Sequence, residues 1–193
     1  IYEDAMSDLV IRNCLDFSQR KIDIFIKDGK IKEISEKIQI NNIPEIDAQG
    51  HFVTSPFIDS HFHMDATLSY GMPRINQSGT LLEGINLWGE LKKDLTGDAI
   101  KDRARKLCKW SIARGTLAIR SHVDVSGDNL MAVEALLDIK NEMEDFLDIQ
   151  LVAFPQDGLY RANCLNNLKT ALSMGVDVVG GIPHFERTMS DGT

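Results

Sequence analysis

Two histidines, His61 and His63, flank a single phenylalanine at the end of the stretch SPFIDSHFHMD. Successive side chains of an extended strand point to opposite faces, so both imidazoles should lie on the same face of a strand. A neutral imidazole nitrogen is a common ligand of Zn²⁺ and other divalent first-row metals. The pattern therefore indicates a metal site. The plainer interpretation is that one histidine is a hydrogen-bonded core residue and the other faces solvent.

Further polar side chains occur where other predicted strands end. His122 and Asp124 follow one apolar run, Gln156 follows the next, and His184 and Glu186 follow a third. In a parallel α/β sheet the functional groups collect at the carboxyl ends of the strands and in the loops that follow them. The same placement also arises without function, because a strand that leaves the core must meet water.

The elements that would carry these residues fall into two regimes. Up to about residue 53, short strands joined by turns are predicted, including a hairpin turn at Asp28-Gly29. From residue 57 onward, four apolar runs alternate with segments of helical spacing, at the intervals of roughly 30 residues that are typical of βα units. Thr96 is the predicted N-cap of one helix, and Gly175 is the predicted end of another. The four predicted strands are 57–63, 117–123, 149–154 and 176–182. This order predicts an α/β fold with a parallel sheet.

Composition and charge narrow the class of protein. The 193 residues are 43% hydrophobic and 26% charged, with a net charge of −8 and interleaved acidic and basic residues. The sequence has no basic patch for nucleic acid or an anionic membrane, and no apolar stretch near the roughly 18 residues of a membrane span. Three widely separated cysteines without a CxxC pair argue against a disulfide framework or a thiolate metal site. We therefore expect a cytoplasmic protein with a small-molecule ligand.

Several segments carry a resemblance to a known family. VTSPFIDSHFHMD resembles the first-strand signature of the amidohydrolase superfamily, in which an HxH motif supplies two metal ligands. Four further segments are similar, in the same order, to segments of bacterial cytosine deaminases. They are NQSGTLLEGI, SHVDVS, IQLVAFPQDG and DVVGGIPHFE.

The resemblance implies a fold and a reaction. The fold is a (β/α)8 TIM-type barrel after a small β-domain, with residues 1–54 forming part of that β-domain and residues 55–193 forming the first half of the barrel. The reaction is hydrolytic deamination of cytosine to uracil and ammonia, a step of pyrimidine salvage, at one Fe²⁺ or Zn²⁺ ion. A bound divalent ion lowers the pKa of a coordinated water and so supplies hydroxide at neutral pH.

The resemblance also assigns roles to individual residues. His61 and His63 would bind the ion. Gln156 would bind the amide edge of the pyrimidine, because a carboxamide offers both a donor and an acceptor. The backbone carbonyl of Leu81 would contact the ring. The other polar residues at strand ends match no metal ligand of the family pattern, and we expect them to make structural hydrogen bonds: His122, Asp124, His184 and Glu186.

Only four of the eight expected β/α units fall within this sequence. The resemblance places the remaining metal ligands and the proton-transferring glutamate beyond residue 193, so no catalytic residue is expected within this chain. The chain is expected to be an incomplete representation of a longer enzyme that forms a homo-oligomer, and little activity is expected from the chain alone. Two alternatives stay open: a related substrate such as isocytosine or a triazine, and a non-catalytic half-barrel that serves as a binding or assembly module.

Overall fold

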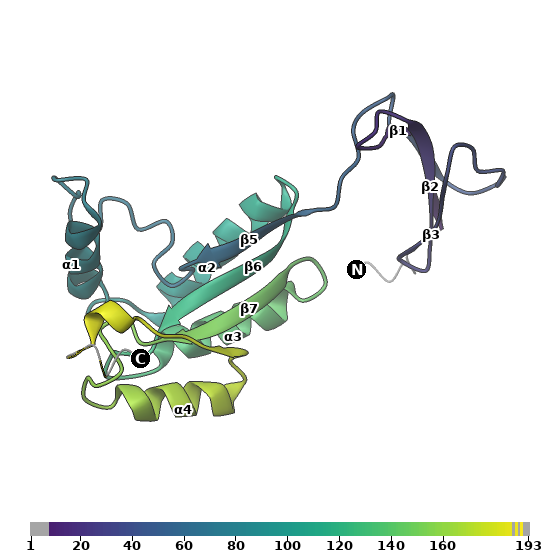
Figure 1. Cartoon of the computed structure of the whole chain (residues 1–193). Helices are drawn as coiled ribbons and strands as arrows, with labels where there is room; N and C mark the ends of the chain where they lie inside the picture. Colours follow the sequence, from purple (N-terminus) through teal and green to yellow (C-terminus); the bar gives the residue numbers. More distant parts are fainter. Residues whose placement is uncertain (1–7, 187, 189, 191–193) are drawn as a thin grey trace. The chain divides into compact units, whose positions relative to one another are not determined.

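The computed structural model describes residues 8–186, 188 and 190, with the backbone but not the side chain of His184. The chain divides into two compact units, Ile1–Ser55 and Pro56–Thr193, each with its own sheet (Figure 1). The predicted boundary, between residues 54 and 55, lies one residue before this division. No helix in the described part of the chain is long and apolar enough to cross a membrane.

The first unit is a four-stranded sheet in the order β3-β2-β1-β4. β2 and β3 form an antiparallel hairpin whose turn residues, Asp28 and Gly29, have φ angles of 48° and 68°. Positive φ at both positions is the type I′ geometry that Asp-Gly favours, so the predicted hairpin is confirmed. The strands are β1 (Leu9–Leu15), β2 (Lys21–Lys27), β3 (Lys30–Ser35) and β4 (Glu45–Asp47).

The second unit is a parallel sheet in the order β5-β6-β7-β8, which confirms the predicted α/β fold. Its strands are β5 (Phe57–Phe62), β6 (Thr116–Asp124), β7 (Asp148–Phe154) and β8 (Val178–Val179). Two helices, α1 (Leu81–Leu91) and α2 (Gly97–Ile112), come between β5 and β6 in the sequence. Single helices follow each later strand: α3 (Met131–Met143), α4 (Cys164–Met174) and the 3-10 helix η1 (Pro183–Phe185).

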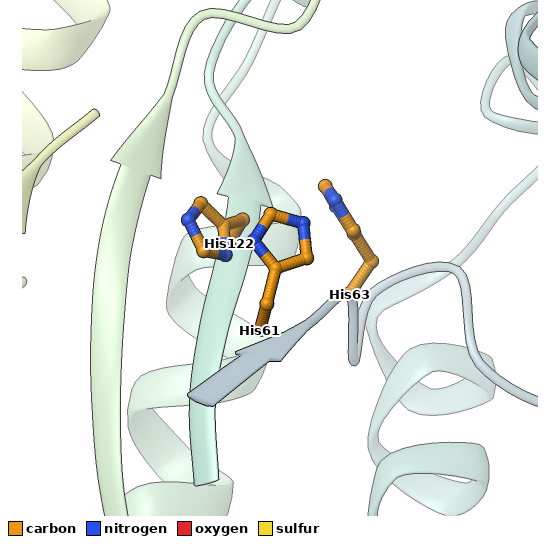
Figure 2. A group of neighbouring side chains, drawn as sticks. All are labelled: His61, His63 and His122. Atoms are coloured by element: carbon orange, nitrogen blue, oxygen red, sulfur yellow. The ribbon is translucent and has the colours of Figure 1, made fainter. Parts of the chain in front are cut away.

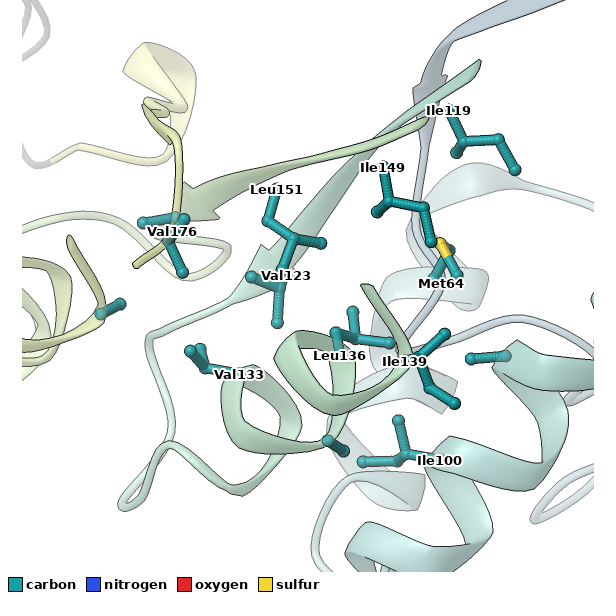
Figure 3. Close-up of a cluster of buried hydrophobic side chains, with 14 of the residues drawn as sticks. Met64, Ile100, Ile119, Val123, Val133, Leu136, Ile139, Ile149, Leu151 and Val176 are labelled. Atoms are coloured by element: carbon teal, nitrogen blue, oxygen red, sulfur yellow. The ribbon is translucent and has the colours of Figure 1, made fainter. Parts of the chain in front are cut away.

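A hydrophobic core lies between one face of this sheet and helices α2, α3 and α4 (Figure 3). Ile100 from α2, Leu136 from α3 and Val123 from β6 are among its fully buried members. Burial of such a side chain contributes about 1.5–3 kcal/mol relative to exposure. Because Ser121 and Val123 are buried toward the helices, His122 between them points to the opposite face of the sheet.

The first three predicted strands match β5, β6 and β7 to within one residue at each end. The fourth, predicted as 176–182, is reduced to the two residues of β8, because the glycines that follow it do not continue the strand. A Cβ atom on Gly180 would lie 2.9 Å from the carbonyl oxygen of Ala153, so the chain can approach β7 closely only with glycine here. The predicted helix ends are confirmed at Thr96, whose side chain caps α2, and at Gly175, which caps α4.

Candidate metal centre and ligand pocket

Three histidine side chains meet at the carboxyl end of the sheet. His61 lies in β5, His63 directly follows that strand, and His122 lies in β6 (Figure 2). One potential ligand atom from each residue lies within 4.8 Å of those of the other two. The ring centroids of His61 and His122 are 4.2 Å apart, and that of His63 lies 5.4 Å from the first and 5.5 Å from the second. The imidazole of His122, for which a structural role was expected, thus lies beside the two predicted ligands.

The pairing of β5 with β6 sets this geometry. The two strands run parallel, and Phe62 pairs with Ser121. Phe62 lies between His61 and His63 in the sequence, and His122 directly follows Ser121. With side chains that alternate between faces, this register directs all three imidazoles to the face opposite the helices.

Two hydrogen bonds from backbone N–H groups to side-chain oxygens continue this attachment past the end of β5. The N–H of Met64 donates to Ser121 Oγ at 2.9 Å, and the N–H of Asp124 donates to Asp65 Oδ2 at 2.9 Å. All four residues are buried, which protects these bonds from competition with water. The turn after His63 is therefore fixed to β6 on both sides of the third histidine.

The electrostatics of the cluster favour neutral rings. Burial, together with repulsion from His122 and His61, lowers the pKa of His63 to about 4. Burial and the neighbouring His61 also lower the pKa of His122 below its ordinary value. Both rings are neutral at pH 7, and neutral imidazole is the form that binds a metal. His63 and His122 are therefore in the form that suits a divalent ion.

A second observation supports a ligand at this position. The Nδ1 atom of His122 is buried, and no hydrogen-bond partner for it exists among the described residues. Buried polar atoms are satisfied in the great majority of cases, so an unpartnered nitrogen beside two other imidazoles points to a bound group. The structural hydrogen bond expected of His122 is thus not made by its Nδ1 atom within the described residues.

Asp65 is a polar residue of the site to which no role was assigned from the sequence. Its side chain is 1% exposed and borders the same pocket as His61 and His63. Burial raises the pKa of Asp65 to about 7, against the lowering effect of hydrogen bonds from the N–H groups of Asp124 and Ala66. The available signal was its spacing, two residues after His63, although that spacing alone does not separate a structural from a functional carboxylate.

The histidines open into a pocket of about 580 Å³. This volume lies within the range of ordinary small-molecule sites. Gln156, on the loop after β7, borders the pocket. Its backbone N–H donates to the carbonyl of Phe154 at 2.9 Å, while its carboxamide has no hydrogen-bond partner in the described part of the chain. The carboxamide is therefore available to a ligand.

Helix α1 forms one wall of the pocket through residues at helical spacing, namely Leu81, Gly84, Ile85 and Trp88. Leu81 is the first residue of the helix, and its side chain is 79% exposed at the pocket rim. This helix is absent from the elements predicted from the sequence. The signal for it was a capping box, in which Thr80 accepts a hydrogen bond from the N–H of Glu83 at 3.3 Å.

Two other strand-end residues make the structural hydrogen bonds that were expected. Asp124 accepts from the N–H of Ser126 at 2.8 Å, and Glu186 accepts from the N–H of Leu159 at 2.6 Å. The prediction for His184 concerns a side chain outside the described ones. The histidines, Asp65 and Gln156 in the pocket therefore come from the ends of β5 and β6 and from the segments after β5 and β7.

Comparisons with known proteins agree with this arrangement. The chain is 34% identical over 186 residues to N-isopropylammelide isopropyl amidohydrolase of Pseudomonas sp. (strain ADP). The aligned segment covers 91% of this chain and 45% of that protein. A crystal structure of 5-methylcytosine deaminase from Klebsiella pneumoniae liganded with phosphonocytosine is similar with a TM-score of 0.88 and 39% identity, over 95% of this chain and 46% of that one. N-isopropylammelide isopropylaminohydrolase from Burkholderia multivorans gives a TM-score of 0.79 and 28% identity, over 91% of this chain and 45% of that one.

The chain thus spans about half the length of the relatives it matches. Its parallel sheet corresponds to part of the barrel in those enzymes, as the sequence resemblance implied. Residues 44–187 match the sequence profile of the amidohydrolase family, a range that includes all three clustered histidines and Gln156. The chain belongs to the amidohydrolase family.

Proposed function

We propose that this chain forms the metal-binding and base-binding part of a hydrolase that deaminates cytosine or a closely related amino-substituted heterocycle. The observation that carries the proposal is the presence of three imidazoles and a free carboxamide around one pocket. Imidazoles suit the ion that such a hydrolysis requires, and the carboxamide suits the amide edge of a pyrimidine.

The histidines act as ligands of one divalent ion, Fe²⁺ or Zn²⁺. His61 and His63 are held by the end of β5, and the unpartnered nitrogen of His122 lies in the same cluster. When bound, the ion supplies an activated water at neutral pH. In the overall reaction a C–O bond forms at the ring carbon that carries the amino group, the C–N bond breaks, and ammonia leaves.

The remaining pocket residues bind and orient the base. Gln156 donates to a ring acceptor and accepts from a ring N–H, so that a base with these groups exchanged leaves buried polar atoms unpaired. Ile85, Trp88 and Phe154 supply apolar surface for the faces of the ring and exclude water. Contact of the ring with the backbone carbonyl of Leu81 is part of the same proposal.

Cytosine is the proposed substrate class because the relative named for 5-methylcytosine is 39% identical with a TM-score of 0.88. Isocytosine or a triazine is the second choice, since the relatives named for N-isopropylammelide are 34% and 28% identical. A free base is proposed over a nucleoside, because the described pocket contains no residues with an evident ribose-binding role.

The decisive test uses the protein expressed from its complete gene and loaded with Fe²⁺ or Zn²⁺. Ammonia release should be fastest with cytosine among cytosine, isocytosine, cytidine and adenine assayed side by side. Turnover of cytidine or adenine without turnover of cytosine would contradict the substrate class, and no ammonia from any base would contradict the reaction.

The metal centre is tested separately by elemental analysis. His61→Ala and His63→Ala should each lose most of the bound ion, because each variant removes a direct ligand. The matched control is His51→Ala, which removes an exposed histidine of the first unit and should keep its metal. Unchanged metal content in both ligand variants would overturn the assignment.

A further inference from the structure

Helix α1 is the wall of the pocket with the least support from the rest of the second unit. In Figure 1 it stands apart from α2, α3 and α4, which pack on the opposite face of the sheet. Its buried residues, Leu87 and Leu91, line a second pocket together with residues of the loop that precedes the helix. The position of this wall over the histidines therefore depends on a small number of side-chain contacts.

One of these contacts is buried and charged. The carboxylate of Asp124, at the end of β6, accepts hydrogen bonds from Trp88 Nε1 at 3.0 Å and from Lys92 Nζ at 3.1 Å. Trp88 is in α1, and Lys92 is its C-cap residue. Lys92 Nζ also donates to Asp157 Oδ2 at 2.8 Å, on the loop that carries Gln156. Two strand ends are thus tied to the same helix.

The other ionic contacts of α1 are more exposed to solvent than the Asp124–Lys92 pair and contribute less to stability. Arg74 pairs with Glu83 and Glu90 of the helix at 3.0 Å and 2.9 Å, but the Arg74 side chain is 48% exposed. Exposed pairs of this type contribute about 0–1 kcal/mol. The Asp124 side chain is only 6% exposed and that of Lys92 22%, so their pair is much less screened by water.

The protonation states are consistent with a permanent contact. Burial by itself lowers the pKa of Lys92, but the carboxylates of Asp124 and Asp157 outweigh that effect and leave the pKa above its ordinary value. The ammonium group is therefore charged throughout the neutral range.

Asp124 is also bound through its backbone to Asp65, in the turn that follows His63. Its N–H donates to Asp65 Oδ2, and Asp124 lies two residues after His122. A single residue thus joins the strand that carries one imidazole to the helix that faces all three.

We propose that Asp124 is a positioning residue that, through Trp88 and Lys92, holds α1 at a fixed distance from the histidine cluster and thereby sets which bases fit the pocket. This inference rests on the proposed function, because it assigns the selectivity of the same site. Loss of the contact should let α1 move outward, which weakens the grip on a small base and leaves the metal in place.

This sequence contains two tryptophans, so a Trp110→Phe background leaves Trp88 as its one tryptophan, and any tryptophan outside it contributes equally to the variants compared. Trp110 is on α2 with 52% exposure and does not border the pocket. In that background, Lys92→Met should make Trp88 more accessible to acrylamide quenching. Lys93→Met, which removes an exposed charge from the adjacent position, is the matched control and should leave quenching unchanged.

Kinetics of the same variants test selectivity in the protein expressed from its complete gene. For Lys92→Met we expect kcat/KM for the best base to fall about tenfold or more, mainly through KM, because a wall that moves by about 1 Å misplaces the substrate. The loss should be smaller for bases with a larger ring substituent, metal content should stay unchanged, and Lys92→Arg should restore part of the activity. Asp124→Asn, which keeps the shape of the side chain, should reproduce the defect.

Two results would overturn this inference: equal quenching of Trp88 in Lys92→Met and Lys93→Met, or an equal loss of kcat/KM for all bases in Lys92→Met. Failure of the proposed function has a different signature. In that case the unsubstituted enzyme releases no ammonia from any base, while the Trp88 measurement still reports whether Lys92 holds α1.

Discussion

At the scale of single residues, the polar groups of the pocket divide into two sets. The imidazoles of His61, His63 and His122 lie at the ends of β5 and β6, and the carboxamide of Gln156 lies on the loop after β7. The proposed metal-binding and base-binding roles can therefore be impaired separately. This separation makes the two roles testable one at a time.

Gln156→Ala should leave the metal content intact and lower kcat/KM for the preferred base by about 10²-fold or more, because the buried amide edge loses its partners. Gln156→Glu keeps an acceptor but loses the donor. Its kcat/KM should lie between that of Gln156→Ala and that of the unsubstituted protein. Metal analysis together with steady-state kinetics measures both effects. Unaltered kinetics in Gln156→Ala would remove this residue from the site.

The position of His122 illustrates which features of the cluster the sequence can predict and which it cannot. That His61 and His63 share a face follows from alternation within one strand, and the structure confirms it. The proximity of His122 depends instead on which residue of β6 pairs with Phe62. Register between parallel strands is set by packing of whole elements against the helices, so a local sequence pattern does not contain it.

At the scale of elements, the start of α1 carries a pH-sensitive contact. Glu83 accepts hydrogen bonds from the side chain of Ser78 and from the N–H groups of Gln77 and Ser78, and these bonds lower the pKa of Glu83 from 4.5 to about 2. A depressed folded-state pKa means that the contact stabilises the helix start above pH 4.5. The stabilisation is lost as the pH falls from 4.5 through 2.

Hydrogen exchange of the α1 amides checks this expectation. At pH 6 the amides of Glu83→Gln should exchange faster than those of the unsubstituted protein, and the difference should close as the pH approaches 2. Glu90→Gln, on the same helix and also paired with Arg74, is the control and should show a smaller difference at pH 6. A gap that persists at pH 2 would contradict the role of the Glu83 carboxylate.

The loop after β7 depends on one glycine. Gly158 has a φ of 95°, and a Cβ atom there would lie 2.9 Å from the carbonyl oxygen of Phe185. Gly158→Ala should therefore destabilise the second unit by about 1–3 kcal/mol, measured from urea unfolding. Gly127→Ala is the control, because a Cβ atom there would lie 3.8 Å from the nearest atom. The urea concentration at the unfolding midpoint should change little in this variant.

The elements predicted from the sequence were those whose hydrophobic period is strong. β5, β6 and β7 are apolar runs bounded by polar residues, and they were found within one residue. Helix α1 is the exception: it buries Leu87 and Leu91 at helical spacing, and it turns Leu81, Ile85 and Trp88 toward the pocket. β8 was overestimated because Gly180 and Gly181, which end it, lie inside an otherwise apolar run.

At the scale of the whole molecule, the two units differ in the size of their cores. The large cluster of buried apolar residues belongs entirely to the second unit. In the described part of the first unit the buried hydrophobic residues are Val10, Cys14, Ile24 and Ile38. Since stability scales with buried apolar surface, the first unit should unfold at a lower urea concentration.

The reactivity of the three cysteines can be used to measure this difference in stability between the two units. Cys14 is 1% exposed in the first unit, and Cys108 and Cys164 are 0% exposed in the second. Burial raises the pKa of Cys108 and of Cys164 to about 11, and it also raises the pKa of Cys14. Because the thiolate is the reactive form, all three thiols of the folded chain should react slowly with a disulfide reagent at pH 8.

In increasing urea, we expect one of the three thiols to react in a first transition and the other two in a second. Cys14→Ala should abolish the first step and preserve the second, which assigns the steps to the units. A single transition that releases all three thiols together would show that the units unfold as one.

The bonds that hold the histidine cluster together also determine when it can form. Met64 and Ser121 are 57 residues apart in the sequence, and Asp65 and Asp124 are 59 apart. Closing a loop of this length costs entropy before any contact is gained, and such distant contacts form late in folding. Until β6 has docked, the chain offers an ion only the two imidazoles of one strand. Under the proposed function, capture of the ion by three imidazoles is therefore a late step of maturation, and an ion retained through purification would mark a chain in which the first parallel strand pair has closed.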